Sequence, residues 1–319
     1  MRVYEHSGAV PPTGAVMALA AGSLAAIGLG IAYSFSFYYI PFVYLNFVLA
    51  MAFGGGTGWV VGCCAREGKI RNVTVVGALA VVAVLAGIYA EWGSTVYAMY
   101  PMAELSQLWN KAGISTFHPL AIVHLMRGLF DEGSWGMSAN SNVTGWPLAG
   151  LWIFETGLVI ATCVTTAVTQ IADHPFCEAC QRWVSGHTPH FYEGNGSESV
   201  WTDVQQGTFE PLALTARATG GEPAFVRLTL KSCDGCSDSN FLTITACKNT
   251  VDTRGNPKLE ETRVVSNMIL MPAQVEIIEA ANIIAPAPGE TPVQMPAPGG
   301  NWTMQSAPLP DKSAAVSQT

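Results

Sequence analysis

Two Cys-x-x-Cys pairs, Cys177/Cys180 and Cys233/Cys236, carry the clearest chemistry in the sequence. Each such pair can hold one edge of a metal ion within a single turn, and two pairs complete a tetrahedral shell of four sulfurs around zinc. Because a four-sulfur shell leaves no position for water, zinc bound in this way stabilises a fold and does not activate a nucleophile. We therefore predict a structural zinc site formed by these four cysteines.

The two pairs are separated by 52 residues, whereas about 15 to 20 is usual for such sites. Residues 173–271, with the segments FCEAC at 176–180 and SCDGC at 232–236, resemble the zinc-ribbon and rubredoxin-like knuckle class. The resemblance implies a metal-binding ribbon with an insertion between its two knuckles. Gln181 and Ser237 stand where this class most often has Gly after the second cysteine, a departure that weakens the match to rubredoxin most and favours zinc over iron.

The composition indicates a membrane protein with an acidic C-terminal part. Half of the 319 residues are hydrophobic and only 12% are charged, against about 25% in soluble domains. Residues 173–319 contain nine Lys/Arg and sixteen Asp/Glu, a net charge of −7. Such a surface repels a phosphate backbone, so we expect no nucleic-acid partner.

Four apolar runs are long enough to cross about 30 Å of hydrocarbon as helices. We therefore predict an α-helical polytopic membrane bundle, residues 14–171, followed by a small β-rich, zinc-ribbon-like cytoplasmic domain. The spans are expected at about 14–38, 42–64, 73–92 and 147–171.

Basic residues in the connection between the second and third spans predict the orientation. Arg66, Lys69 and Arg71 lie there, and short basic loops face the cytoplasm. We expect the protein in a plasma (inner) membrane. Residues 1–13 and the region after the fourth span then lie in the cytoplasm, and residues 94–146 lie outside. The four cysteines would be in a reducing compartment, where thiols remain available to a metal.

The remaining segments are predicted from their periodicity. Apolar spacing over 119–131 indicates an interfacial helix in the outer segment, lying either on the outer leaflet or against the ends of the spans. Domain 172–284 is expected to contain an antiparallel sheet and two short helices. Strands are predicted at 225–230, 241–247 and 262–271, helices at 203–218 and 274–283, and a Pro-rich disordered tail at 285–319.

Small residues recur every fourth position along the first two spans and predict close helix contacts, either within the chain or with another subunit. The sets are Gly14, Ala18, Gly22, Ala26 and Gly30, and Gly54, Gly58 and Gly62.

Glu155 is an ionisable residue inside the fourth span, and two interpretations are open. It is a proton or cation site, with Glu91 and Asn46 nearby. Alternatively, its carboxyl group is hydrogen-bonded to its neighbours or reaches the surface.

No arrangement of nucleophile, base and orienting acid, and no nucleotide-binding motif, stands out in the sequence. We therefore expect a non-enzymatic membrane scaffold or adaptor, whose zinc-ribbon domain binds or positions a protein partner or takes part in an oligomeric complex. The alternatives are a membrane redox protein with a rubredoxin-like iron site and a transporter or channel subunit that uses Glu155.

Overall fold

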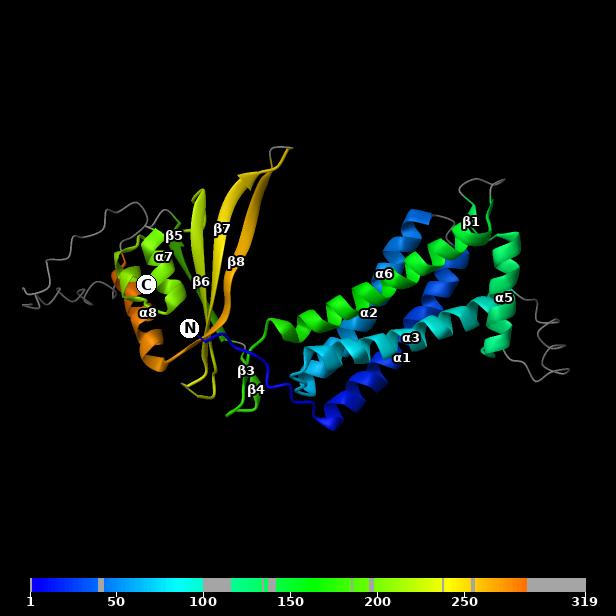
Figure 1. The fold of residues 1–319 in the computed structure, drawn as a ribbon, viewed down its shortest axis with the longest axis horizontal. Coiled ribbons are helices and arrows are strands. Elements are labelled where there is room, and N and C mark those ends of the chain that lie inside the picture. Colours follow the sequence, from blue (N-terminus) through cyan, green and yellow to red (C-terminus); the bar gives the residue numbers. More distant parts are fainter. Residues whose placement is uncertain are drawn as a thin grey trace, which may run out of the picture.

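The computed structural model combines a bundle of long helices with a separate sheet domain (Figure 1). It describes residues 2–39, 43–99, 116–133, 135–136, 142–184, 186–194, 198–236, 238–253 and 256–285. The predicted Pro-rich tail therefore lies outside the described residues, apart from Ala285.

Four helices of the bundle are long and apolar enough to cross a membrane, which confirms the predicted fold class. Each begins and ends within a few residues of the expected span, except that the third continues for seven residues beyond position 92. The helices are α1 (Pro12–Tyr39), α2 (Val43–Glu67), α3 (Val73–Met99) and α6 (Gly145–Ala172).

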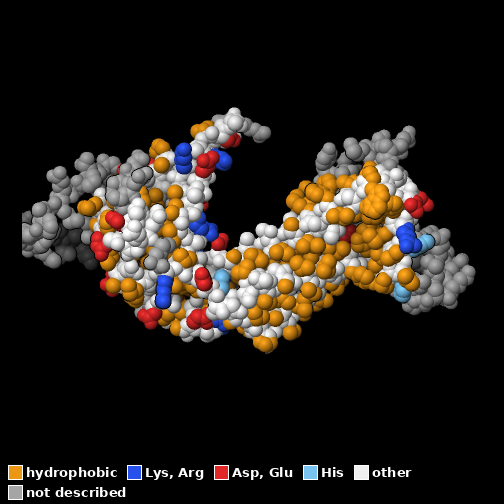
Figure 2. All heavy atoms as spheres, in the orientation of Figure 1, with side chains coloured by type: hydrophobic (Ala, Val, Ile, Leu, Met, Phe, Trp, Pro, Cys, Tyr) orange, Lys and Arg blue, Asp and Glu red, His pale blue; other side chains and the backbone are white. Residues whose placement is uncertain are grey.

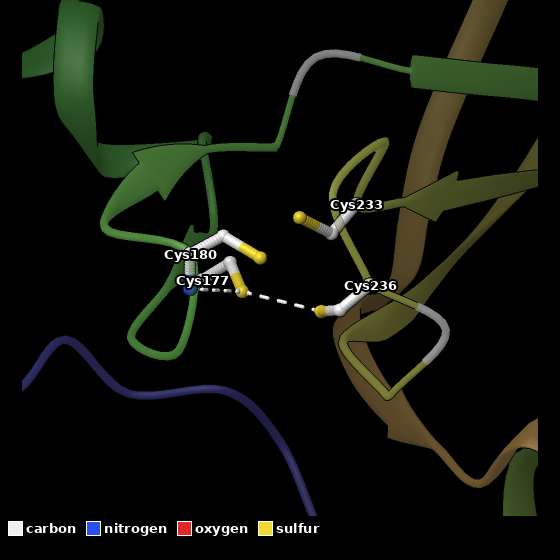
Figure 3. A group of neighbouring side chains, drawn as sticks. All are labelled: Cys177, Cys180, Cys233 and Cys236. Atoms are coloured by element: carbon white, nitrogen blue, oxygen red, sulfur yellow. Dashed lines mark hydrogen bonds between the residues drawn. The ribbon is translucent and has the colours of Figure 1, made fainter.

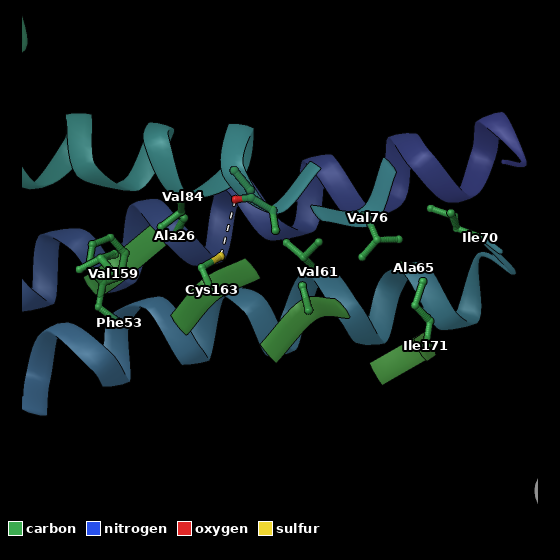
Figure 4. Packing of buried hydrophobic residues seen from close by; sticks show 14 of the residues in the cluster. Ala26, Phe53, Val61, Ala65, Ile70, Val76, Val84, Val159, Cys163 and Ile171 are labelled. Carbon is green, nitrogen blue, oxygen red and sulfur yellow. Dashed lines mark hydrogen bonds between the residues drawn. The ribbon is translucent and has the colours of Figure 1, made fainter. Parts of the chain in front are cut away.

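Glycines allow the backbones of these helices to approach closely, as the small-residue spacing predicted. α1 packs mainly against α3, and α2 mainly against α6. A Cβ atom added at Gly30 would overlap the carbonyl group of Gly87, and one at Gly58 would overlap the carbonyl group of Cys163. Both glycine sets therefore serve contacts within the chain. Figure 4 shows the buried side chains between them, including Val61, Val84 and Cys163.

The predicted outer helix is present as α5 (Pro119–Glu132). Its buried residues Ile122 and Leu125 pack against Val96 near the end of α3, which matches the alternative of a helix against the ends of the spans. A short hairpin follows, in which the strands β1 (Trp135–Gly136) and β2 (Asn142–Val143) have two residues each. Residues 100–115 of the predicted outer segment lie outside the described residues.

The sheet domain is a four-stranded antiparallel meander, in the order β5-β6-β7-β8, with helices on one face (Figure 1). Leu228, Leu242 and Met268 from the strands pack against Leu212 and Ile278 from the helical side. The elements are β5 (Gly186–Glu193), β6 (Ala224–Ser232), β7 (Asn240–Val251), β8 (Pro257–Leu270), α7 (Glu198–Gln206), η1 (Glu210–Leu214) and α8 (Pro272–Ile284).

The structure differs from the prediction in the 203–218 region and in β5. Instead of one helix, α7 ends before Gly207, whose φ of +94° requires glycine, and η1 follows. Strand β5 was not predicted. It contains Pro189, which cannot donate a ladder hydrogen bond and is tolerated because β5 is at the edge of the sheet.

The N-terminal residues are part of the sheet domain. The backbone N–H of Tyr4 donates to Asn267 O, and the N–H of Ile269 donates to Arg2 O, each at 2.9 Å. Val3 thereby forms a bridge with Met268 on the edge of β8. The start of the chain and the sheet domain consequently lie at the same end of the bundle, as an even number of spans requires.

Candidate metal centre

The four predicted cysteines converge on one point between two different sheets (Figure 3). Cys177 ends β3 (Phe176–Cys177), and Cys180 lies in the turn to β4 (Arg182–Trp183), directly after α6. Cys233 and Cys236 lie in the connection from β6 to β7. The two pairs thus belong to a small hairpin and to the end of the four-stranded sheet, a different arrangement from a single ribbon with an insertion.

The sulfur atoms are arranged as a metal shell would need. All four Sγ atoms lie within 4.8 Å of one another, and those of Cys177 and Cys236 are 3.6 Å apart. Sulfurs bound to one zinc at about 2.3 Å in a tetrahedron would be about 3.8 Å apart. All eight cysteines of the chain are free thiols, so the cluster is not a pair of disulfides. The cluster can therefore hold a metal ion.

Backbone and hydroxyl donors surround the sulfurs. The N–H of Cys180 donates to Cys177 Sγ at 3.3 Å, and the Ser239 hydroxyl donates to the same sulfur at 3.2 Å. The backbone N–H of Asp238 donates to Cys236 and, together with the Cys177 thiol, lowers the pKa of Cys236 to about 6. The hydrogen bond with Cys236 has the opposite effect on Cys180, whose pKa is raised. The donors therefore favour the thiolate, the form that binds metals, at Cys177 and Cys236.

Two residues of the knuckles fit the cluster in different ways, Gln181 by its backbone conformation and Gly235 by its lack of a side chain. Gln181 has a φ of +52°, the left-handed conformation that glycine commonly provides after the second cysteine, and its side-chain amide donates to Glu178 O at 2.6 Å. A Cβ atom at Gly235 would lie 2.9 Å from Cys180 Sγ. The Gln181 position was noted in the sequence as a departure from the class, whereas the need for Gly235 became visible only when the pairs were brought together.

The first knuckle is packed against the connection between α2 and α3. Arg71, which is 8% exposed, forms an ion pair with Glu178 between the two cysteines, and its guanidinium lies 4.4 Å from the Phe176 ring centre. The Trp183 indole N–H donates to Arg66 O at 2.7 Å. Burial alone would raise the pKa of Glu178, but hydrogen bonds from Ser7 and Arg71 hold this pKa below its usual range.

A second group of polar residues lies inside the bundle. The Tyr33 hydroxyl on α1 donates to the Glu155 carboxylate on α6, and Glu91 on α3 lies close enough to interact electrostatically with Glu155. Tyr33 is 4% exposed and stacks on Phe53. The described hydrogen-bond partner of Glu155 is thus a tyrosine from another helix.

Asn46, the third polar residue considered with Glu155, is also buried in the bundle. Its Oδ1 atom has no hydrogen-bond partner among the described residues.

The fold and the site together define a protein with four helices able to cross a membrane and a sheet domain that carries a possible metal-binding cysteine cluster. Comparison with known proteins gave no match: no protein-family model, no curated protein and no solved structure matches this chain.

Proposed function

We propose that the four cysteines bind a structural zinc ion and that the protein is a non-enzymatic membrane scaffold or adaptor. The convergence of Cys177, Cys180, Cys233 and Cys236, with their sulfurs within 4.8 Å of one another, carries this proposal. Zinc bound by four thiolates is coordinatively closed and therefore structural. The sheet domain then lies on the cytoplasmic side of the membrane, where the thiols stay reduced.

The contacts of the first knuckle support a positioning role. Glu178 and Trp183 join the cysteine hairpin to the α2–α3 connection, while Asp173, directly after α6, pairs with Arg263 of β8. The zinc ion would link this hairpin to the β6–β7 connection at the adjacent end of the main sheet, so that the domain is held in one orientation relative to the membrane. A domain with a fixed orientation can present its surface to a protein partner or a further subunit.

Metal analysis of the purified full-length protein tests the metal assignment. We expect one zinc ion per chain and no visible absorption band. A stoichiometric iron content with visible thiolate-to-iron absorption would instead establish the redox alternative. The Cys247→Ser variant is the matched control, because Cys247 is a buried thiol in the same domain but outside the cluster.

Crosslinking in native membranes tests the scaffold role. A specific partner should be captured by the wild-type protein and by Cys247→Ser but lost in Cys233→Ser. Equal capture by all three proteins would contradict a role for the metal-clamped domain.

The contact of Tyr33 with Glu155, close to Glu91, favours one second candidate, a transporter or channel subunit. A buried carboxylate beside a second carboxylate is costly within a membrane and is commonly functional. Glu155→Gln should then abolish proton or cation flux into proteoliposomes, whereas Tyr33→Phe should reduce it. Wild-type liposomes with no flux above that of empty liposomes would exclude this candidate.

A further inference from the structure

The ends of β7 and β8 form a two-stranded arm that extends beyond the rest of the sheet (Figure 1). β6 begins at Ala224, which pairs with Lys248, and the backbone N–H of Asn249 still donates to Pro223 O at 2.9 Å. Beyond that point Thr250 and Val251 of β7 pair with Lys258 and Pro257 of β8. The end of the arm therefore has no third strand beside it in the described part of the chain.

The two faces of the arm differ in polarity. Directly opposed residues of antiparallel strands share a face, and successive residues alternate between faces. Asn249 with Leu259 and Val251 with Pro257 form one face, on which Val251 is 69% and Leu259 43% exposed. The opposite face carries Thr250 with Lys258 and Lys248 with Glu260.

The apolar face is the one that looks toward the side of the bundle. Arg263 and its cross-strand partner Thr245 belong to the same face as Val251 and Leu259. Arg263 Nη1 donates to Asp173 Oδ1 at 2.6 Å, directly after the end of α6. Lys231 Nζ, from β6, donates to Asp173 O at 2.9 Å. The helices of the domain cover the other face.

A hollow separates the arm from the outer surface of the bundle (Figure 2). Hydrophobic side chains cover the visible surface of the bundle beside this hollow. The four helices are apolar enough to cross a membrane, and in a membrane lipid would fill the space beside them. The arm leans toward the bundle and is therefore directed toward that space (Figure 1).

We propose that the apolar face of this arm, formed by Val251, Pro257 and Leu259, docks at the boundary between lipid headgroups and acyl chains. The two aliphatic side chains enter the boundary, as the apolar faces of interfacial elements do. Lys248 and Lys258, with long apolar stems, extend from the opposite face toward lipid phosphates and water. The arm is then a second membrane contact of the sheet domain, independent of any ion at the cysteine cluster.

Electron paramagnetic resonance of the full-length protein in nanodiscs of phosphatidylcholine and phosphatidylglycerol tests this proposal. A ketone-bearing amino acid is placed at position 251 and coupled to a nitroxide, which leaves the eight cysteines untouched. Position 250, on the opposite face, is the control. We expect the label at 251 to collide more often with oxygen, which is soluble in lipid, and the label at 250 to collide more often with a water-soluble nickel chelate.

Three results would overturn the proposal. These are water-type accessibility at position 251, equal behaviour of the two labels, and protection of position 251 from both reagents. The last result would show that a protein, either a partner strand or a second copy of the chain, covers the face instead.

A charge-matched pair of variants gives an independent readout. Val251→Asp with Leu259→Asp removes the apolar face, whereas Thr250→Asp with Lys258→Gln changes the net charge equally on the polar face. Proteinase K should cleave the arm of the first variant in nanodiscs about tenfold faster than that of the wild type, because two partly exposed aliphatic side chains no longer partition into lipid. Equal cleavage of the two variants would contradict lipid docking.

Discussion

The helix bundle and the sheet domain bring distant segments together in different ways. In the bundle, contact is spread along the whole length of the helices, and several glycines each contribute one close approach, such as Gly58 against Cys163. In the sheet domain, a single point joins two separate sheets, because the four cysteines meet between the β3–β4 hairpin and the β6–β7 connection.

This difference has a consequence for how each region responds to substitution. Where packing is distributed, one change removes a small part of the total and the neighbouring contacts remain. Where four ligands converge on one ion, the loss of one ligand affects every segment that the ion joins. The following experiments test this contrast, from the largest expected effect to the smallest.

If the cluster binds zinc as proposed, Cys233→Ser should unfold the part of the sheet domain around the cluster and leave the bundle inserted. Structural zinc sites of this type contribute about 10–16 kcal/mol on binding, and most of this is lost without a complete shell. Hydrogen exchange measured by mass spectrometry on the protein in micelles should show loss of protection at residues 176–184 and 232–241. Protection in α1, α2, α3 and α6 should stay unchanged.

Cys247→Ser is the control for that experiment. Cys247 is 3% exposed on β7, so its substitution tests for the loss of a buried thiol without the loss of a ligand. If both variants behaved alike, or if a metal-free Cys233→Ser protein kept full protection, the clamp would not be the main stabilising element of the domain.

Gly58→Ala should destabilise the bundle by about 1–3 kcal/mol, the usual cost of overpacking a well-packed interface. The new methyl group would overlap the backbone of Cys163, so α2 and α6 must separate. Gly157→Ala is the control, because no atom lies within 4 Å of a Cβ at that position. Thermal unfolding in micelles should lower the midpoint only for Gly58→Ala. Equal midpoints would show that the close contact is dispensable.

Arg71→Ala should loosen the junction between the bundle and the sheet domain by about 1–2 kcal/mol. The variant loses the ion pair with half-exposed Glu178, which contributes little by itself, and the cation–π contact with Phe176. Faster hydrogen exchange at residues 66–72 and 176–184 would report this loss. Lys258→Ala, which removes an exposed pair with Glu260, should change exchange at neither segment.

His190 gives the smallest predicted effect, a decrease in the stability of the sheet domain in mild acid. Burial lowers the pKa of His190 below its ordinary value, although the hydrogen bond to Asn282 acts in the opposite direction. Below pH of about 6.5 the unfolded chain therefore binds more protons at this residue than the folded domain does, so stability falls as the pH falls.

The slope due to this group is at most about 1.4 kcal/mol per pH unit. Denaturant unfolding at pH 7 and pH 5 measures it, and a His190→Gln variant should show a weaker dependence on pH. The same dependence in the variant would assign the effect to other groups.

Local patterns in the sequence predicted much of this architecture. Apolar runs of the required length predicted the four helices to within a few residues, apart from the last seven residues of α3, since hydrogen bonds in a helix are local. The glycine spacing along the first two spans predicted close packing correctly. The alternation around residues 225–230 indicated a strand, and the Cys-x-x-Cys pairs identified the four thiols that meet.

Other features depend on contacts between residues far apart in the sequence. The proline in β5 concealed an edge strand, and nothing in the first residues indicated that Val3 pairs with Met268. Tyr33 lies 122 positions from Glu155, so its hydrogen bond could not be read from either helix alone. The insertion between the knuckles proved to contain β5 and β6, two of the four strands of the main sheet.

The sequence by itself determined which segments are long and apolar enough to span a membrane, which residues are small enough for close helix packing and which thiols are spaced to share an ion. Tertiary structure decided that the two cysteine pairs come from different sheets and that the hairpin of the first pair contacts Arg71 and Arg66. It also decided that the apolar face of the β7–β8 arm is directed toward the bundle. The physical reason is that helix formation and turn geometry depend on neighbours along the chain, whereas strand partners and domain orientation depend on which distant surfaces can bury each other.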